Sequence, residues 1–454
     1  MDRSQKRLLF AFSILIGLTR LFAHAQSLFD WDEALFARGV RYYDVSDDRP
    51  HAPGYPLFVG AAKIANLVVY DDFRSLQLVV LSGAVILFPA VALLAFELGF
   101  DFPTSIMAAL IFTFLPNVWV YGGTGFSDIP AIGLCLMGSC LVLRGAVNNG
   151  LFVLGIATVA ISCGMRPANI LIAAIPVAAS LRNKSRVGRT EILALIIGIA
   201  IILASYGGAA IASSSSLAYW QVIRKQSKYV LKQDSFQNAG RPSLPSLVVD
   251  FLVEPIHQPV LMGFIDILAM VGLIGAYRRR RRSVALALLM FMPVAVFSWL
   301  TLDYAAAGRY SIAYLPAYAL FAAEALSTLF HGNSLRTVVG GVLVGSMAIW
   351  TWPGLSEQRT VVATPVAAFN WIKHNVPRST VLYVNAKLAP QGAYLLPDRG
   401  QVLFNTLEEV PRNHAVWIID VDDVQSGREF VISRKPLWNI LRRRNFETWV
   451  YQVP

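Results

Sequence analysis

The sequence predicts a mainly α-helical membrane protein: a polytopic bundle of transmembrane helices followed by a small C-terminal α/β domain. Hydrophobic residues make up 56% of the 454 residues and charged residues only 15%, whereas a soluble protein of this length carries roughly a quarter charged residues. The mean hydropathy is +0.54. Apolar runs recur up to residue 353, and about 20 such residues in a helix cross a hydrocarbon core. We therefore assign 1–353 to a transmembrane domain and 354–454 to a soluble domain.

One apolar segment is too short to cross the membrane. The apolar segments lie at about 8–24, 56–69, 76–97, 104–121, 129–145, 151–165, 168–181, 190–211, 259–277, 284–300, 310–330 and 336–353. The segment 56–69 carries Lys63 and Asn66, and about fourteen residues at ~1.5 Å each cannot span ~30 Å. We interpret it as an interfacial helix in the first outer loop. The other segments then predict about 11 spans.

Clustered basic residues predict the orientation. The formal net charge is +11, and the clusters are Arg3 with Lys6 and Arg7, then 182–189, then 278–282. Short basic loops beside apolar spans are retained in the cytoplasm, and we favour this over nucleic-acid binding. With 56–69 excluded from the spans, all three clusters and the N-terminus fall on the cytoplasmic side of the cytoplasmic membrane. The first outer loop, the long loop 212–258 and the C-terminal domain are then extracytoplasmic.

The last hundred residues have the composition of an ordinary soluble segment. We expect helices over Pro365–His374 and Ser433–Arg444, buried strands over Thr380–Asn385 and Ala415–Val421, and a closing strand over Thr448–Val453. About a hundred residues suffice for a small α/β domain.

Three carboxylates follow the first span. Acidic residues at a membrane edge are costly unless they are solvated, paired or used. Asp30, Asp32 and Glu33 lie before a stretch with helical apolar spacing. An Asp at a helix start often serves only as a cap, which we favour for Asp30 and leave open for Asp32. Two adjacent acids, Asp32 and Glu33, give the helix start one group for capping and one that faces the cavity, and a carboxylate that faces a dry cavity can act as a general base.

Further polar residues follow in the next outer segments. The sequence His51-Ala52-Pro53-Gly54-Tyr55-Pro56 predicts a rigid turn before the interfacial helix. Lys63 on that helix is either functional or a snorkelling lysine. Asp128, in Ser127-Asp128-Ile129-Pro130, fits a helix cap and is also a second acid at the level of Asp32.

Several cations stand on the outer face, against the usual charge bias. They are Arg166, Arg309 and the group Arg224, Lys225 and Lys228. Guanidinium groups bind phosphate well, although solvation is the more common fate of a single loop lysine. The sequence has no P-loop, no Gly-rich nucleotide fingerprint, no HExxH and no GxSxG, so a lipid-borne phosphate suits these carboxylates and arginines better than a soluble nucleotide does.

Taken in order, these motifs resemble those of the C-type (GT-C) membrane glycosyltransferases. The chain is most similar to bacterial relatives of the protein O-mannosyltransferases and of the aminoarabinose lipid A transferases. The matching pieces are Asp32-Glu33-Ala34, His51-Ala52-Pro53-Gly54-Tyr55-Pro56, Ser127-Asp128-Ile129-Pro130, Gly164-Met165-Arg166-Pro167, and Arg309-Tyr310 followed by Leu315-Pro316. Their order and spacing match up to about residue 330. Ala52 stands where the family commonly has proline.

The resemblance implies transfer of a sugar, of the hexosyl or mannosyl type, from a polyprenyl-phosphate donor. The acceptor hydroxyl belongs to a glycan, a lipid or a protein on the outer face, and the anomeric carbon is inverted. Asp32 becomes the general base, with Glu33 in support and Asp128 orienting the acceptor or the base.

It also implies a binding site for the donor phosphate. Arg166, Arg309 and Lys63 would hold this phosphate and stabilise the charge of the leaving group. The supporting residues are His51, Tyr55 and Tyr310. A divalent cation on Asp32, Glu33 and Asp128 stays open, since some members of the superfamily use one.

Two other functions share this hydropathy profile. A transporter or flippase of lipid-linked intermediates would favour internal repeats and polar residues at mid-membrane depth, whereas here the ionisable residues gather at one face. A scaffold whose C-terminal domain binds a partner is the weaker alternative.

Overall fold

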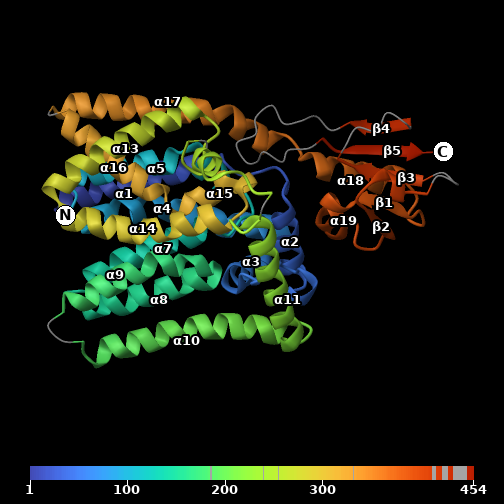
Figure 1. Ribbon diagram of the computed structural model, residues 1–454, viewed down its shortest axis with the longest axis horizontal. Helices are drawn as coiled ribbons and strands as arrows, with labels where there is room; N and C mark the ends of the chain where they lie inside the picture. Colours follow the sequence, from blue (N-terminus) through green and yellow to red (C-terminus); the bar gives the residue numbers. More distant parts are fainter. Residues whose placement is uncertain are drawn as a thin grey trace.

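The computed structural model consists of a long helical bundle with a smaller α/β domain at one end (Figure 1). It describes residues 1–184, 187–238, 240–253, 255–330, 332–411, 416–421, 428–432 and 447–453. The N-terminus lies at the end of the bundle far from the α/β domain (Figure 1).

Every apolar segment predicted from the sequence lies on a helix. The bundle helices are α1 (Arg3–Arg20), α4 (Asp72–Glu97), α5 (Phe102–Phe114), α6 (Pro116–Tyr121), α7 (Asp128–Arg144), α8 (Asn149–Met165), α9 (Ile170–Arg182), α10 (Arg189–Ala212), α13 (Pro259–Arg279), α14 (Arg281–Thr301), α15 (Ala307–Tyr310), α16 (Leu315–Leu329) and α17 (Asn333–Thr360). Helices α4 and α7 approach closely because Gly83 has no side chain: a Cβ there would lie 2.3 Å from the Pro130 Cα. Helix α17 continues past residue 353, so the predicted domain boundary falls inside it.

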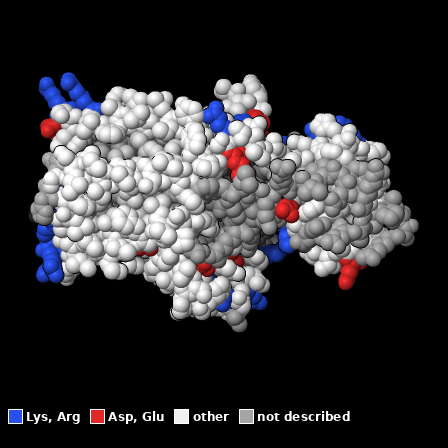
Figure 2. All heavy atoms as spheres, turned by 90° about the horizontal axis from the view of Figure 1, so that it is seen from above, with Lys and Arg blue, Asp and Glu red and all other residues white. Residues whose placement is uncertain are grey.

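Length and composition identify the membrane helices directly. Five helical stretches in the described residues are long and apolar enough to cross a membrane, or six if the bent pair Tyr304–Ala313 and Leu315–Leu329 is one span. Helix α10 exposes Ile196 and Leu203 at 56% and 67%, a pattern that suits lipid rather than water. Figure 2 likewise shows a broad uncharged band along the bundle. The chain is a membrane protein, and the count of about 11 spans remains a prediction.

The end of the bundle far from the α/β domain is rich in arginine and lysine (Figure 2). Contacts between distant segments define it. The Arg282 guanidinium donates to the Asn183 side chain at 2.6 Å, and the guanidinium groups of Arg280 and Arg336 lie 3.7 and 3.5 Å from the Asp101 carboxylate. We call this the basic end. Two of the three predicted cytoplasmic clusters therefore meet on one side of the bundle.

The opposite end carries short helices that lie between the bundle and the α/β domain (Figure 1). We call it the domain end. Its helices are α2 (Trp31–Arg41), α3 (Pro56–Val69), α11 (Ser216–Tyr229) and α12 (Leu244–Val248). Helix α3 has the predicted bounds and exposes Ile64, Leu67 and Val68 at 71%, 71% and 79%, as expected of a helix at a membrane surface. The predicted long loop 212–258 contains α11 and α12, two helices that were not predicted from the sequence.

In its described residues, the C-terminal domain has a five-stranded mixed sheet and two α-helices. Its elements are α18 (Thr364–Asn375), β1 (Leu382–Asn385), α19 (Ala389–Leu395), β2 (Gln401–Phe404), β3 (Val416–Asp420), β4 (Arg428–Ile432) and β5 (Trp449–Val453). The strand order is β2-β1-β3-β5-β4; β1 pairs in parallel with β2 and β3, whereas β5 is antiparallel to β3 and β4. The predicted α18, β1, β3 and β5 are present, α19, β2 and β4 were not predicted, and the predicted helix Ser433–Arg444 lies outside the described residues.

Candidate active site

The candidate site begins at the first turn of α2. The Asp30 carboxylate caps the helix by accepting from the Asp32 N–H at 2.9 Å, so its predicted role as a cap is correct. The Glu33 carboxylate completes a capping box and accepts from the N–H groups of Phe29 and Asp30 at 2.8 and 3.0 Å. Because the other two acids, Asp30 and Glu33, bind backbone N–H groups at the helix start, the Asp32 carboxylate is left to face other segments.

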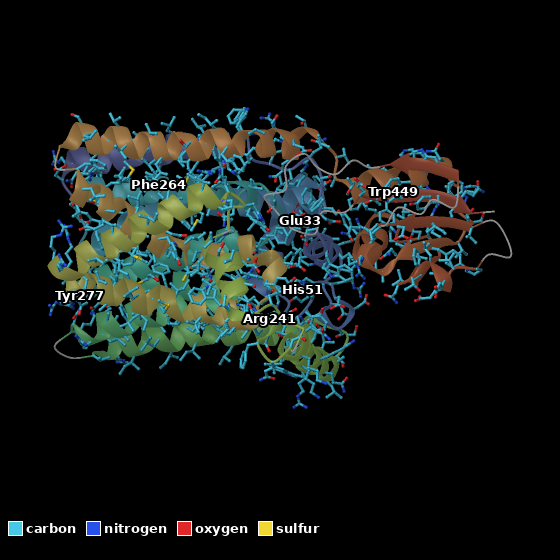
Figure 3. The ribbon with its side chains drawn as sticks, turned by 45° about the horizontal axis from the view of Figure 1, so that its top comes forward. Glu33, His51, Arg241, Phe264, Tyr277 and Trp449 are labelled. Atoms are coloured by element: carbon cyan, nitrogen blue, oxygen red, sulfur yellow. The ribbon has the colours of Figure 1, made fainter. Side chains whose placement is uncertain are left out.

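Glu33 also links α2 to the turn that precedes α7. Its second carboxylate oxygen accepts from the Gly125 N–H at 2.7 Å, and the residue is 1% exposed. Figure 3 shows Glu33 at the end of the bundle that faces the α/β domain. Burial raises the pKa of Glu33 to about 7, although the backbone N–H groups of Phe29 and Gly125 oppose this. Glu33 is therefore a buried residue whose hydrogen bonds hold α2 against the segment that carries Asp128.

Arg309 joins the two remaining acids. Its guanidinium donates from Nε to Asp128 at 2.8 Å and from Nη1 to Asp32. On the other side, the Arg166 guanidinium lies 2.7 Å from the second oxygen of Asp128. The side chains of Arg309 and Asp128 are 2% and 7% exposed, whereas that of Asp32 is 20% exposed. Asp32 is thus the more accessible acid in a chain of alternating charges.

Aromatic and amide side chains hold Arg309 in place. Its guanidinium carbon lies 4.1 Å from the Phe126 ring centre and 5.5 Å from that of Tyr310. The Asn117 amide donates to the Gly308 carbonyl at 2.7 Å and contacts the Ser311 hydroxyl at 3.1 Å. The sequence gives no signal for Asn117 or Phe126, because both lie in apolar surroundings where an ordinary core role is expected.

The turn before α3 brings His51 to the same cluster. Gly54 has a φ of +95°, a conformation that favours glycine, and Tyr55 follows at +45°. His51 Nε2 lies 3.2 Å from the Tyr55 hydroxyl, and His51 Nδ1 lies 3.8 Å from Asp32. The Phe36 ring packs against both His51 and Tyr55.

Burial and charge set the protonation of these two groups. Burial lowers the pKa of His51 more than the nearby Asp32 carboxylate raises it, so the imidazole is neutral near pH 7. Burial alone would raise the pKa of Asp32, but His51 and Arg309 outweigh it and hold that pKa below its usual value. Asp32 is therefore ionised in the resting arrangement.

The structure brings together most, but not all, of the residues singled out in the sequence. Those that meet in the cluster are Asp32, His51, Tyr55, Asp128, Arg166, Arg309 and Tyr310. Lys63 makes no ion pair with described residues; burial lowers its pKa, opposed by the charge of Asp72. Glu33 faces backbone N–H groups rather than the cluster.

The carboxylates do not form a metal site in this arrangement. No three His, Cys, Asp or Glu side chains among the described residues are grouped to hold a metal ion. Asp32 and Asp128 both accept hydrogen bonds from Arg309, and Glu33 accepts from backbone N–H groups. The set Asp32, Glu33 and Asp128 therefore does not fit a divalent cation without rearrangement.

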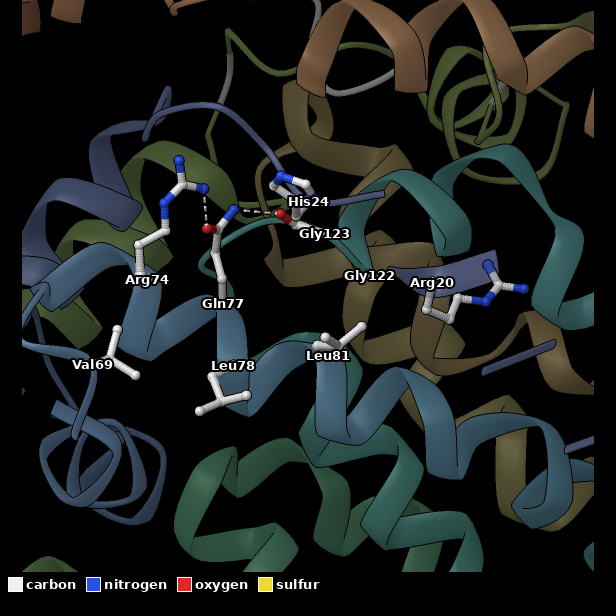
Figure 4. A pocket seen from close by; sticks show the side chains of 9 residues that line it. All are labelled: Arg20, His24, Val69, Arg74, Gln77, Leu78, Leu81, Gly122 and Gly123. Carbon is white, nitrogen blue, oxygen red and sulfur yellow. Dashed lines mark hydrogen bonds between the residues drawn. The ribbon is translucent and has the colours of Figure 1, made fainter. Parts of the chain in front are cut away.

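A groove of about 350 Å³ lies beside the turn that precedes α7, on the face formed by α1 and α4 (Figure 4). It is lined by Arg20, His24, Val69, Arg74, Gln77, Leu78, Leu81, Gly122 and Gly123. The Gln77 amide donates to the Gly123 carbonyl at 2.8 Å and accepts from Arg74 at 2.7 Å. The groove contains none of the clustered acids, and its polar residues hold the segment that leads to Asp128.

No protein-family model matches the chain, and no curated protein sequence matches it. The chain is, however, similar in fold to several solved structures. ArnT from Cupriavidus metallidurans bound to undecaprenyl phosphate superposes with a TM-score of 0.58 at 13% identity, covering all of this chain and 98% of that one. The Archaeoglobus fulgidus oligosaccharyltransferase in complex with Zn and sulfate gives 0.58 at 14% identity, covering 87% of this chain and 62% of that one.

The chain has the fold of the GT-C membrane glycosyltransferases. The resemblance drawn from the sequence motifs is therefore confirmed at the level of the fold. The chain matches ArnT over almost the full length of both proteins, including the C-terminal domain, whereas it spans less than two thirds of the archaeal oligosaccharyltransferase.

Proposed function

We propose that the chain is an integral membrane glycosyltransferase that moves a sugar from a polyprenyl-phosphate donor to an acceptor hydroxyl. The observation that supports this most is the buried cluster of Asp32, Asp128, Arg166 and Arg309 at the domain end of a GT-C fold. It combines a partly exposed carboxylate with two guanidinium groups, which are the groups that a base and a phosphate site require.

The donor phosphate binds the two arginines in this proposal. One solved neighbour, ArnT, is bound to undecaprenyl phosphate. In the resting cluster Arg309 is already shared between two carboxylates, so an incoming phosphate competes with Asp32 for its Nη1 donor. Loss of that contact removes one of the charges that lower the pKa of Asp32, and donor binding thereby makes the carboxylate a stronger base.

Asp32 then takes the proton of the acceptor hydroxyl. The acceptor oxygen attacks the anomeric carbon from the side opposite the phosphate, and the new glycosidic C–O bond forms as the bond to the phosphate oxygen breaks. That oxygen leaves with the electron pair, so the anomeric configuration inverts. Arg166 and Arg309 stabilise the charge that develops on the polyprenyl phosphate.

The other residues position this chemistry. Asp128 orients both arginines, His51 and Tyr55 border Asp32, and Glu33 fixes the helix that carries it. The alternative of a transporter or flippase has no comparable support, because the solved neighbours are transferases. The sugar of the hexosyl or mannosyl type and the glycan, lipid or protein acceptor remain expectations.

The orientation belongs to the same proposal: about 11 spans, a cytoplasmic N-terminus, and an extracytoplasmic site and C-terminal domain. The arrangement of arginine-rich loops at the basic end supports it. A reporter fused after residue 70 should be extracytoplasmic, and a cytoplasmic signal would contradict the assignment.

The direct test is sugar transfer by membranes that contain the chain, supplied with a polyprenyl-phosphate sugar and candidate acceptors. Asp32→Asn should lower the rate by about 10²–10⁴-fold, the usual contribution of a general base. Asp47→Asn is the matched control, since this acid is on the same loop with its side chain 61% exposed. Full transfer by Asp32→Asn would overturn the assignment of the base.

A second variant tests the phosphate site. Arg166→Ala should raise the KM for the donor more than the KM for the acceptor, because Arg166 contacts the leaving group in this proposal. An equal rise for both substrates in well-folded protein would contradict it.

A further inference from the structure

Helix α11 carries a stripe of cations that the catalytic cluster does not use. Arg224, Lys225 and Lys228 lie on the helix, and Lys232 follows one turn later. Spacings of three and four residues place them on one side of the helix. All four are exposed, residues 216–232 contain no Asp or Glu, and none of the four forms an ion pair with a described residue.

The opposite side of α11 is anchored to the turn that bears His51. Tyr219 is 1% exposed and donates to the Pro53 carbonyl at 3.1 Å. Val222 and Ile223 pack with Tyr219 against Ala52. The helix therefore has a fixed inner face, and its cationic stripe points away from the protein.

Large apolar side chains continue the exposed face. Leu217 and Trp220 are 69% and 55% exposed, and with Arg224 and Lys228 they follow the spacing of one helix face. Figure 1 shows α11 running across the domain end, steeply inclined to α10, whose exposed apolar side chains indicate that it crosses the membrane. A helix in the plane of the membrane surface that combines leucine, tryptophan and cations is the pattern of an interfacial helix.

We propose that the outer face of α11 binds the phosphate headgroups of anionic phospholipids at the membrane surface. Leu217 and Trp220 enter the headgroup region, and the four cations contact the lipid phosphates. Each cation close to such a surface favours anionic lipid roughly fivefold at low salt, with a range of about one Debye length. The exposed apolar residues favour a lipid surface over a soluble acidic partner, and the proposal does not depend on the glycosyltransferase assignment.

A dye on the stripe reports this contact in the full chain. The native cysteines Cys135, Cys140 and Cys163 are buried, so Gln221→Cys, at an exposed position of α11, can be labelled selectively with a polarity-sensitive dye. The protein is reconstituted in vesicles of phosphatidylcholine, alone or with phosphatidylglycerol. We expect a blue shift with phosphatidylglycerol that high salt reverses, and Lys228→Gln should reduce the preference up to roughly fivefold.

The combined Gln variant of all four cations should abolish the lipid response, whereas Arg281→Gln at the basic end should leave it unchanged. A thermal unfolding curve confirms that each variant is folded, and the readout requires no sugar transfer. Identical emission in neutral and anionic vesicles would overturn the proposal. So would an equal shift on adding soluble polyglutamate, or inorganic phosphate at matched ionic strength, to protein in neutral vesicles.

Discussion

One arrangement of ion pairs from each end of the bundle shows the same residue types used in opposite ways. At the domain end Arg309 contacts Asp32 and Asp128 with its own side chain only 2% exposed. At the basic end Arg280 lies 3.7 Å from Asp101, with these side chains 30% and 41% exposed. The first arrangement is buried and balanced in charge, whereas the second is open to solvent and carries an excess of arginine.

This difference distinguishes charged residues that form a candidate functional site from charged residues that set the orientation in the membrane. Exposed ion pairs contribute about 0–1 kcal/mol, and their excess positive charge serves mainly to keep loops on one side of a membrane. A buried pair contributes little net stability over an apolar core, but removing one partner is costly because the other charge stays buried. Because buried ion pairs add little stability, their presence at the domain end points to a functional role, and this end is the candidate for chemistry.

The largest predicted effect is the loss of Arg309. Arg309→Met leaves Asp32 and Asp128 without their shared guanidinium and should lower the free energy of unfolding by about 3–5 kcal/mol. Arg280→Met at the basic end should change it by no more than about 1 kcal/mol. Denaturant titration in detergent measures both. Adding Asp128→Asn to Arg309→Met should restore part of the loss, and equal losses at the two ends would contradict the comparison.

A pH dependence follows from Glu33. Its pKa in the folded chain is about 7, above the ordinary 4.5, so the folded state holds the proton more tightly than the unfolded state. The stabilisation is complete below about pH 4.5 and is lost as the pH rises through about 7. Glu33→Gln should remove this slope from the unfolding free energy, and an unchanged pH profile would show that folding does not raise the pKa of Glu33.

His51 should produce the opposite slope. Burial lowers its pKa, so the unfolded state binds the proton more tightly and stability falls as the pH drops below about 6.5. His51→Gln should flatten the profile in this acidic range only. If the wild-type and variant curves run parallel there, the imidazole is not held neutral by its surroundings.

The smallest effect compares two arginine–aromatic contacts. The Arg41 guanidinium lies 4.6 Å from the Tyr394 ring and joins α2 to α19, whereas Arg281 lies 5.3 Å from Tyr277 at the basic end (Figure 3). Tyr394→Leu, which keeps apolar bulk, should destabilise the chain by about 1 kcal/mol and Tyr277→Leu by about half as much, given typical cation–π energies. Tyr394→Leu alone should also speed proteolytic cleavage between the two domains.

Much of the bundle could be predicted from the sequence because hydropathy acts locally. Helix α3 has the predicted bounds, Pro56–Val69, since proline starts it and its composition changes at the end. By contrast, α11 was missed because its mixed polar and apolar residues resemble a loop when the surface that buries Tyr219 is unknown. The four-residue strand β2 has an exposed middle and offers no hydrophobic pattern.

Most residues of the candidate site could be predicted from the sequence, but the contacts between them could not. Asp32 and Arg309 are 277 residues apart, and Asp128 and Arg309 are 181 apart, so only the folded chain reveals that one guanidinium serves both acids. Glu33 follows Asp32 directly in the sequence. Its three backbone N–H partners depend on a helix cap and on the distant Gly125, which residue types alone do not specify.

The docking of α19 on α2 has a consequence for biosynthesis. The Gln391 amide lies 3.5 Å from the Phe29 carbonyl, and the Arg41 guanidinium donates to the Tyr394 carbonyl at 3.3 Å, across 362 and 353 residues of sequence. A ribosome that has just delivered the helix with Asp32 must therefore still synthesise nearly the whole chain before that helix gains its last partners. The helix that carries the candidate base is made more than 350 residues before its contacts with α19 can form, so α2 gains these contacts only after α19 of the C-terminal domain has been synthesised.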